Sequence, residues 1–212
     1  MVYVNVGCGF DVGEGWLNID ASPTLRFERL PVMGGLYTKN ASRFPAAAHY
    51  GDIVKGPLCE EGTADGVYAS HMLEHLPRDA CVSALRHIHV MMKPGGVFRL
   101  VVPDLETRAR AYVAAVEAGE GTPADGFMQE TLLGQERAPK GLLRRLAALF
   151  GHQAHLWMWD EATLAAVLTD VGFRNIRRCD FGDAEDPMFA RVEAKVRFDS
   201  DFGPELALEY RK

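Results

Sequence analysis

The segment Val2–Val6 is a short, mostly apolar run that stops at Gly7-Cys8-Gly9. A run of this length that ends in a glycine turn predicts a buried parallel strand. Glycine has no Cβ, so the turn lets the backbone adopt positive φ and approach a ligand closely. A tight structural turn without a ligand is the alternative interpretation.

Strand-like and helix-like periods alternate along the rest of the chain, which favours an α/β architecture. Further strands are predicted at Trp16–Ile19, His49–Ile53, Gly66–Ser70, Val97–Val102, Asn175–Phe181 and Glu205–Tyr210. Helices are predicted where apolar residues share one face, after Pro77 (Cys81, Leu85, Ile88, Met92) and between Asp160 and Gly172 (Leu164, Val167, Leu168, Val171). We expect residues 21–48 to form a long loop with about one helical turn, while 189–198 fit either a strand or a helix.

Residues 104–158 are too long for a simple connection and contain two helical patterns, Leu105–Ala118 and Lys140–Phe150. An insert at the carboxyl end of a central strand lies over the crevice where open α/β sheets bind ligands. We therefore expect one domain, residues 1–212, with a helical, lid-like insert at about 104–158. A rigid cover is one competing interpretation, and a homodimer contact is another, made by Leu142, Leu146 and Leu149.

The charge balance and the cysteines exclude several classes of protein. The 212 residues carry 23 Lys and Arg against 29 Asp and Glu, a net charge of −6, which disfavours a nucleic-acid-binding surface. No apolar run approaches the ~20 residues that span a bilayer, and the first residues do not resemble a secretion signal. Cys8, Cys59, Cys81 and Cys179 are scattered. They are typical of reduced thiols in a cytoplasmic protein.

Carboxylates follow the second and third predicted strands. Asp20 is placed to accept both hydroxyls of a ribose. Asp52 could accept an adenine amino group while Ile53 packs on the ring, although a solvated turn residue is the alternative. Asp20 follows Gly7 by 13 positions, where dinucleotide folds expect about twenty, and Val12 replaces their third glycine. The pattern therefore favours a nucleoside without phosphates over NAD.

His71-Met72-Leu73-Glu74-His75 fits the H-x-x-E-H pattern of some zinc hydrolases. That chemistry needs a third protein ligand and an open zinc position, and the sequence singles out no third ligand. We therefore expect no metal. The segment is better interpreted as a strand-end loop, Ser70-His71, that leads into a helix.

The insert holds further candidates for catalysis. Asp104 follows the strand Val97–Val102 and either caps the next helix or acts in the site. His155, like His152, lies near tryptophans and is either a packed histidine or a catalytic one. The second predicted helix of the insert has two interpretations. Either its apolar face packs on the protein and its basic face is exposed to solvent, or its basic residues, Lys140, Arg144 and Arg145, dock an anionic or lipid-linked substrate.

In this order, these segments resemble class I S-adenosylmethionine (SAM)-dependent methyltransferases. The resemblance rests on Val4–Gly9, Asp20, Gly51-Asp52, Ala64–Leu76, Met92–Gly96 and Val101–Leu105. Small methyltransferases associated with surface-polysaccharide biosynthesis are similar in the segments GWLNID, SHMLEHL, VPDL, HLWMWD and LALEYRK.

The resemblance implies a Rossmann-like, seven-stranded, mostly parallel sheet in the order 3-2-1-4-5-7-6, with the seventh strand antiparallel. It implies that SAM lies across the carboxyl ends of the first and fourth strands. Gly7 and Gly9 would face its methionine part, Asp20 the ribose and Asp52 the adenine. The full set of expected cofactor-binding residues is Gly7, Cys8, Gly9, Asp20, Asp52, Ile53 and Ser70.

The activity implied is methyl transfer to an oxygen or nitrogen nucleophile of a small-molecule or saccharide acceptor, with release of S-adenosylhomocysteine (SAH). A hydroxyl acceptor needs a base, for which the candidates are His71, His155 and Asp104, in that order. One alternative is an NAD(P)-dependent oxidoreductase, which the missing third glycine disfavours. The other is a non-catalytic methyltransferase-like scaffold, against which the presence of both Asp20 and Asp52 argues.

Overall fold

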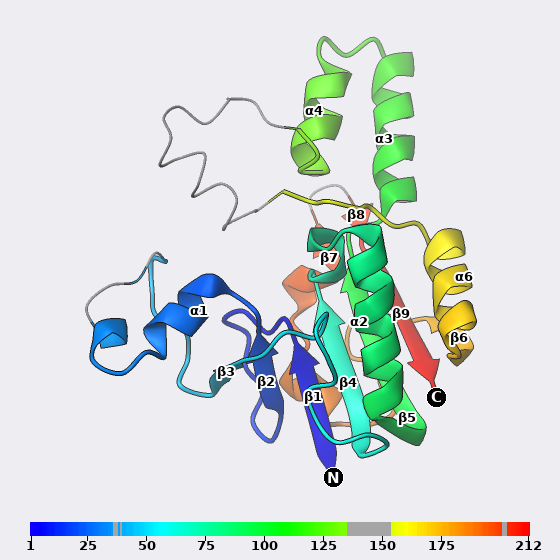
Figure 1. Cartoon of the computed structure of the whole chain (residues 1–212). Coiled ribbons are helices and arrows are strands. Elements are labelled where there is room, and N and C mark those ends of the chain that lie inside the picture. The colour runs from blue at the N-terminus through cyan, green and yellow to red at the C-terminus, as the bar shows by residue number, and fades with distance from the viewer. Residues whose placement is uncertain (36–37, 39, 135–153, 201–202) are drawn as a thin grey trace.

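The computed structural model describes residues 1–35, 38, 40–134, 154–200 and 203–212 (Figure 1). At its centre is a seven-stranded sheet in the order β3-β2-β1-β4-β5-β9-β6. The strands are β1 (Val2–Val6), β2 (Leu17–Asp20), β3 (Ala48–Tyr50), β4 (Ala64–Ser70), β5 (Met92–Val102), β6 (Arg174–Arg178) and β9 (Leu206–Arg211). Strands β1 to β5 pair in parallel, and β9 is antiparallel to both of its neighbours. This arrangement confirms the predicted fold, with β9 as the seventh strand.

Two helices cover one face of the sheet and form the main core with it. Helix α2 (Arg78–Met91) buries the predicted face of Cys81, Leu85 and Ile88. Helix α6 (Glu161–Val171) begins at Asp160, whose side chain accepts a hydrogen bond from the Thr163 amide at 2.7 Å, and ends at Gly172 with φ 122°. Helix α6 therefore begins and ends where the sequence predicts, and α2 begins there. Met92, expected on the helical face, is instead the first residue of β5, which starts earlier than the predicted Val97.

On the other face of the sheet, the connection between β1 and β2 contains no helix. Residues 7–16, all of which the structure describes, form a loop there. Two buried asparagines hold this loop in place. The Asn18 side chain bonds both the amide and the carbonyl of Gly13, at 2.9 and 3.0 Å. Asn5 donates to the Asn18 side chain at 3.2 Å and to the Asp11 carbonyl at 2.8 Å. Side chains thus replace the hydrogen bonds that a helix would make in its own backbone.

A distant segment, residues 179–198, covers this second face instead. Within it, residues 189–198 form neither the strand nor the helix that the sequence allowed. They contain two short 3-10 turns, η3 (Phe189–Arg191) and η4 (Lys195–Arg197). Phe189 is fully buried and packs edge-on against Trp16, with ring centroids 5.4 Å apart. A small hairpin, β7 (Asp199–Ser200) and β8 (Gly203–Pro204), follows this covering segment.

The insert begins with α3 (Leu105–Glu117) and α4 (Pro123–Glu130), which stand beyond the carboxyl ends of the parallel strands (Figure 1). The first turn of α3 is anchored by Arg108, which pairs with both carboxylate oxygens of Glu205 at 2.8 Å. Helix α4 was not predicted. The predicted helix Lys140–Phe150 lies outside the described residues, as do the leucines assigned to a homodimer contact. No helix in the described part of the chain is long and apolar enough to cross a membrane.

Two other expectations need adjustment. The third strand is shorter than predicted and ends at Tyr50, so Asp52 lies in the following turn, where its side chain accepts a hydrogen bond from the Val54 amide at 3.1 Å. The loop after β2 contains α1 (Pro23–Glu28), which is about the single helical turn expected, and a short turn, η1 (Met33–Gly35).

Candidate active site

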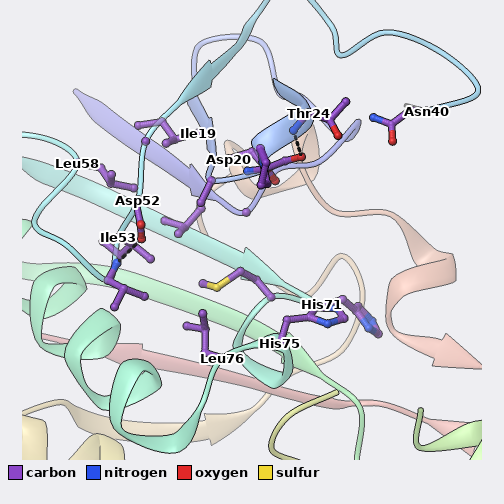
Figure 2. Close-up of a pocket in the computed structure, with 18 residues that line it drawn as sticks. Ile19, Asp20, Thr24, Asn40, Asp52, Ile53, Leu58, His71, His75 and Leu76 are labelled. Atoms are coloured by element: carbon purple, nitrogen blue, oxygen red, sulfur yellow. Dashed lines mark hydrogen bonds between the residues drawn. The ribbon is translucent and has the colours of Figure 1, made fainter. Parts of the chain in front are cut away.

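Two adjoining cavities lie at the carboxyl ends of β1, β2 and β4. The large cavity, of about 710 Å³, is lined by Asp20, Asp52, Ile53 and His71 among others (Figure 2). The small cavity, of about 200 Å³, is lined by Cys8, Gly9, Tyr68, Ser70 and Arg197 among others. Gly7, Asp20 and His71 line both. Every predicted cofactor-binding residue therefore lines at least one of the two cavities.

The glycine turn after β1 depends on the absence of side chains at two positions. Gly7 and Gly9 have φ values of 69° and 52°, in the left-handed region that other residues avoid. A Cβ at Gly7 would lie 2.4 Å from Cγ of Met72, whereas a Cβ at Gly9 would meet no heavy atom within 4 Å. Gly7 thus permits close packing, and Gly9 leaves open space in the wall of the small cavity.

Asp20 connects the glycine turn to the loop after β2. Its Oδ2 accepts a hydrogen bond from the Gly9 amide at 3.0 Å, and its Oδ1 accepts one from the Ser22 amide at 2.7 Å. Because each carboxylate oxygen has a second lone pair, both oxygens can also accept from a ligand hydroxyl. The same side chain therefore shapes the turn and faces both cavities.

The far side of the large cavity combines an acid with apolar walls. Asp52 lies beside Ile53 and Leu58, while His71 and His75 lie together on the opposite side (Figure 2). Asp52 is partly neutralised by Lys55, whose Nζ lies 2.8 Å from Oδ2. These walls suit a ligand with a flat apolar ring and a hydrogen-bond donor at the edge of that ring, which Asp52 could accept from. Leu58 was missed by the sequence analysis, because a leucine in a loop carries no signal of its own.

The small cavity is more polar. The hydroxyls of Tyr68 and Ser70 are buried there and have no hydrogen-bond partner in the described structure. Arg197 pairs with Asp11 at 2.7 Å. Burial raises the pKa of the Cys8 thiol to about 12, so this residue is part of the wall and not a nucleophile. The sequence analysis missed Tyr68, inside a strand, and Arg197, which only the covering segment brings here.

His71 follows β4 directly, with φ 50°. Its Nε2 lies 2.9 Å from the Arg197 carbonyl oxygen, and its Nδ1 lies 3.5 Å from Oε1 of Glu74. Since a carbonyl can only accept, Nε2 carries the proton and Nδ1 is the basic nitrogen. Burial lowers the pKa of His71, but the Glu74 carboxylate and the Arg197 carbonyl outweigh burial and raise it overall. Of the three predicted bases, His71 is the one that lines the cavities.

The other two predicted bases, His155 and Asp104, line neither cavity. His155 is buried next to Glu74, 4.0 Å from its carboxylate, and burial lowers its pKa. Asp104 caps α3: it accepts hydrogen bonds from the Glu106 amide and the Thr107 hydroxyl, both at 3.0 Å. The capping interpretation of Asp104 is confirmed, and we do not retain it as a base. His152 and the basic residues Lys140, Arg144 and Arg145 lie outside the described residues.

The fold defines the class: a Rossmann-like protein whose ligand site lies at the carboxyl edge of the sheet. Solved structures to which this chain is similar include SAM-dependent methyltransferases from three organisms. The protein from Methanosarcina mazei is 15% identical (99% of this chain, 89% of that one, TM-score 0.50), and the one from Archaeoglobus fulgidus is 16% identical (99% and 85%, TM-score 0.49). The one from Mesorhizobium loti is 14% identical (100% and 90%, TM-score 0.49). No curated protein matches the sequence.

Residues 7–178 match the model of the methyltransferase domain family, and the chain belongs to that family. This match confirms the prediction of a class I methyltransferase with SAM as cofactor. An enzyme of this kind also requires an acceptor for the methyl group. The oxidoreductase and scaffold alternatives are therefore set aside.

Proposed function

We propose that this protein transfers a methyl group from SAM to an oxygen or nitrogen nucleophile of a small-molecule or saccharide acceptor. The observation that carries the proposal is the place of His71, which lines both cavities and has the Glu74 carboxylate 3.5 Å from its Nδ1 to stabilise the protonated ring. SAM supplies an electrophilic methyl group on a sulfonium, so the protein has to orient the reactants and remove a proton.

The described residues fit this cofactor. Asp20 keeps free lone pairs for the ribose hydroxyls, and Asp52 with Ile53 offers an acceptor and an apolar wall for adenine. The unpartnered hydroxyls of Tyr68 and Ser70 suit the charged amino-acid end, because a buried polar group without a partner is costly. The large cavity thus takes the nucleoside, and the small cavity takes the methionine part.

His71 accepts the proton when the acceptor is a hydroxyl. Its Nε2–H is held by the Arg197 carbonyl, which fixes the tautomer and the orientation of the ring. Its Nδ1 takes the proton, and the Glu74 carboxylate, 3.5 Å away, stabilises the resulting imidazolium. The acceptor therefore binds on the side of the large cavity that His71 and His75 line (Figure 2).

The helices α3 and α4 select the acceptor. They stand beyond the sheet edge that holds the site (Figure 1). The buried ion pair of Arg108 with Glu205 holds the first turn of α3. Amide hydrogen exchange in 109–130 should slow when SAH and acceptor bind together. Unchanged exchange would support the rigid cover instead. Because the sequence resembles methyltransferases of surface-polysaccharide biosynthesis, saccharides are the first acceptors to test. We propose that the reaction takes place in the cytoplasm.

Mass spectrometry of cell extract and saccharide panels incubated with methyl-labelled SAM tests the reaction. We expect a labelled product that depends on the protein. For a hydroxyl acceptor, His71→Ala should lower kcat by about 10²–10⁴-fold, the range for loss of a general base. The matched control is His49→Ala, an exposed histidine on β3 that lines neither cavity. Full activity of His71→Ala toward a hydroxyl would contradict the assignment of this base.

A further inference from the structure

Three side chains from two distant segments meet beside the large cavity. Glu74 and His75 lie in η2 (Leu73–His75), the turn after β4, and His155 lies in the segment that leads into α6. One ligand atom from each of them lies within 4.8 Å of the other two. The Leu156 and Trp157 amides both donate to the Glu74 carbonyl, at 2.7 and 3.2 Å, and so join the two segments.

The Glu74 carboxylate needs a counter-charge. Glu74 is 0% exposed, and neither oxygen of its carboxylate has a hydrogen-bond partner in the described structure. His155 is 8% exposed, and its Nδ1 is also buried without a partner. Buried charges in proteins are paired, hydrogen-bonded or bound to metals, because an isolated one is strongly destabilising. Apart from His71, whose Nδ1 lies 3.5 Å from Oε1, the described residues supply this carboxylate with no close cationic partner, so the cluster can take up a cation.

The histidines are oriented as ligands. Nδ1 of His75 lies 3.2 Å from the Ala154 carbonyl oxygen, so it carries the proton and leaves Nε2 with its lone pair toward Glu74. Nε2 of His75 and Nε2 of His155 each lie 4.0 Å from Oε1 of Glu74. Ligand atoms around a tetrahedral metal at ~2.1 Å are about 3.4 Å apart. The two Glu74–histidine distances would shorten by about 0.6 Å on metal binding, and the third ligand distance already lies within 4.8 Å.

We propose that Glu74, His75 and His155 bind one divalent transition metal ion, with an open position toward the large cavity. Two imidazoles and one carboxylate suit zinc and its first-row neighbours, whereas calcium and magnesium prefer oxygen ligands alone. The sequence shows H-x-x-E-H without a third ligand, and the structure supplies His155, eighty positions after His75. His75 lines the large cavity together with His71, so the metal faces the acceptor side.

The role of the metal rests on the proposed function. A metal held by Glu74, His75 and His155 would act as a Lewis acid that lowers the pKa of an acceptor hydroxyl, so that the hydroxyl would lose its proton more readily. The proton would pass to Nδ1 of His71, and the oxygen would bond to the methyl carbon as the bond from that carbon to the SAM sulfur breaks, with SAH as the leaving group. Glu74 serves both groups, since its Oε1 also lies 3.5 Å from Nδ1 of His71. The metal therefore favours hydroxyl acceptors over amines.

Metal binding can be tested without methyl transfer. Full-length protein is stripped with chelator, dialysed against Zn²⁺ or Co²⁺ and examined by elemental analysis and by the visible absorption of bound Co²⁺. We expect one tightly held ion per chain and a Zn²⁺-dependent rise in melting temperature. His75→Ala and Glu74→Gln should lower the metal content at least tenfold, while His49→Ala should retain it.

Binding of SAH separates the two proposals. His75 is partly exposed, so His75→Ala is the variant expected to keep its fold, and a thermal shift with SAH verifies this. A wild-type protein that binds SAH but holds no stoichiometric Zn²⁺ or Co²⁺ would overturn the metal site and leave the methyltransferase proposal intact. Metal content that is the same in His75→Ala and in wild type would also overturn it.

Discussion

Nε of Arg99 donates a hydrogen bond to the Glu193 carboxylate at 2.7 Å, and both side chains are excluded from solvent. Arg99 lies on the central strand β5, while Glu193 belongs to the covering segment 179–198. Glu209 on β9 accepts from the same guanidinium at 2.6 Å. The Arg99–Glu193 ion pair therefore holds the covering segment, residues 179–198, against the sheet beneath the small cavity.

Arg99→Leu should destabilise the protein by about 3–5 kcal/mol, because it leaves the buried Glu193 carboxylate without its charged partner, whereas Glu209 keeps its pair with Arg177. Urea unfolding at neutral pH measures the loss. Arg110→Leu is the matched control: Arg110 pairs with Glu106 at 2.6 Å, but its side chain is 78% exposed. Such surface pairs contribute about 0–1 kcal/mol. Equal losses in the two variants would contradict a fastening role for Arg99.

Asp20→Ala should weaken SAH binding at least tenfold. A hydrogen bond to a charged group contributes about 1.5–3 kcal/mol, and the variant also frees the Gly9 amide that Asp20 holds at 3.0 Å. Isothermal titration calorimetry measures the affinity. Asp125→Ala, an exposed carboxylate in α4, should bind SAH like the wild type. Wild-type affinity in Asp20→Ala would mean that the ribose lies elsewhere.

Gly9→Ala should weaken SAH binding, because its methyl group would enter the wall of the small cavity. The left-handed backbone, with φ 52°, adds a stability cost of about 1–2 kcal/mol. Gly62→Ala separates the two effects: Gly62 has φ 68°, and an added Cβ there also meets nothing within 4 Å, but it lines neither cavity. We expect both variants to lose similar stability in urea, and only Gly9→Ala to lose affinity for SAH.

Asp65→Asn should destabilise the protein at neutral pH and have little effect in acid. Lys93 and the Val2 amide hydrogen-bond to the Asp65 carboxylate and lower its pKa below the unfolded value. The stabilisation is thus present above the unfolded pKa of ~3.9 and disappears as pH falls through the folded pKa. With Lys93 partly exposed, we expect a loss of about 1–2 kcal/mol near pH 7.

Urea unfolding of wild type and Asp65→Asn across the acid range gives this profile. The difference between the two proteins should shrink steadily as the carboxylate becomes protonated. A difference that stays constant down to about pH 2.5 would show that the amide fails for steric reasons and not through lost charge.

The sequence predicts the sheet and its two packed helices well, because their signals are local. The spacing of Cys81, Leu85 and Ile88 is enough to orient α2, and Asp160 and Gly172 mark the ends of α6. Helix α4 escaped prediction because Gly126 interrupts a short pattern, although Pro123 is well tolerated in a first turn.

The candidate site was predictable where it follows strand ends and not where it depends on tertiary packing. Asp20 and Ser70 follow from the rule that parallel strands end at one edge of the sheet. Arg197 reaches the small cavity, and His155 reaches the cluster with Glu74 and His75, from segments with no such rule. The capping role of Asp104 was foreseen as one of two interpretations, and only its hydrogen bonds decide between them.

Strand β9 has a consequence for the newly made chain. Among the described strands of the sheet it comes last in the sequence, after β6, yet it lies between β5 and β6 in the finished sheet. Until Leu206–Arg211 have emerged, β5 keeps an unpaired edge, which is prone to association with other chains. We therefore expect a nascent chain that has not yet exposed β9 to depend on a chaperone until it can complete its sheet.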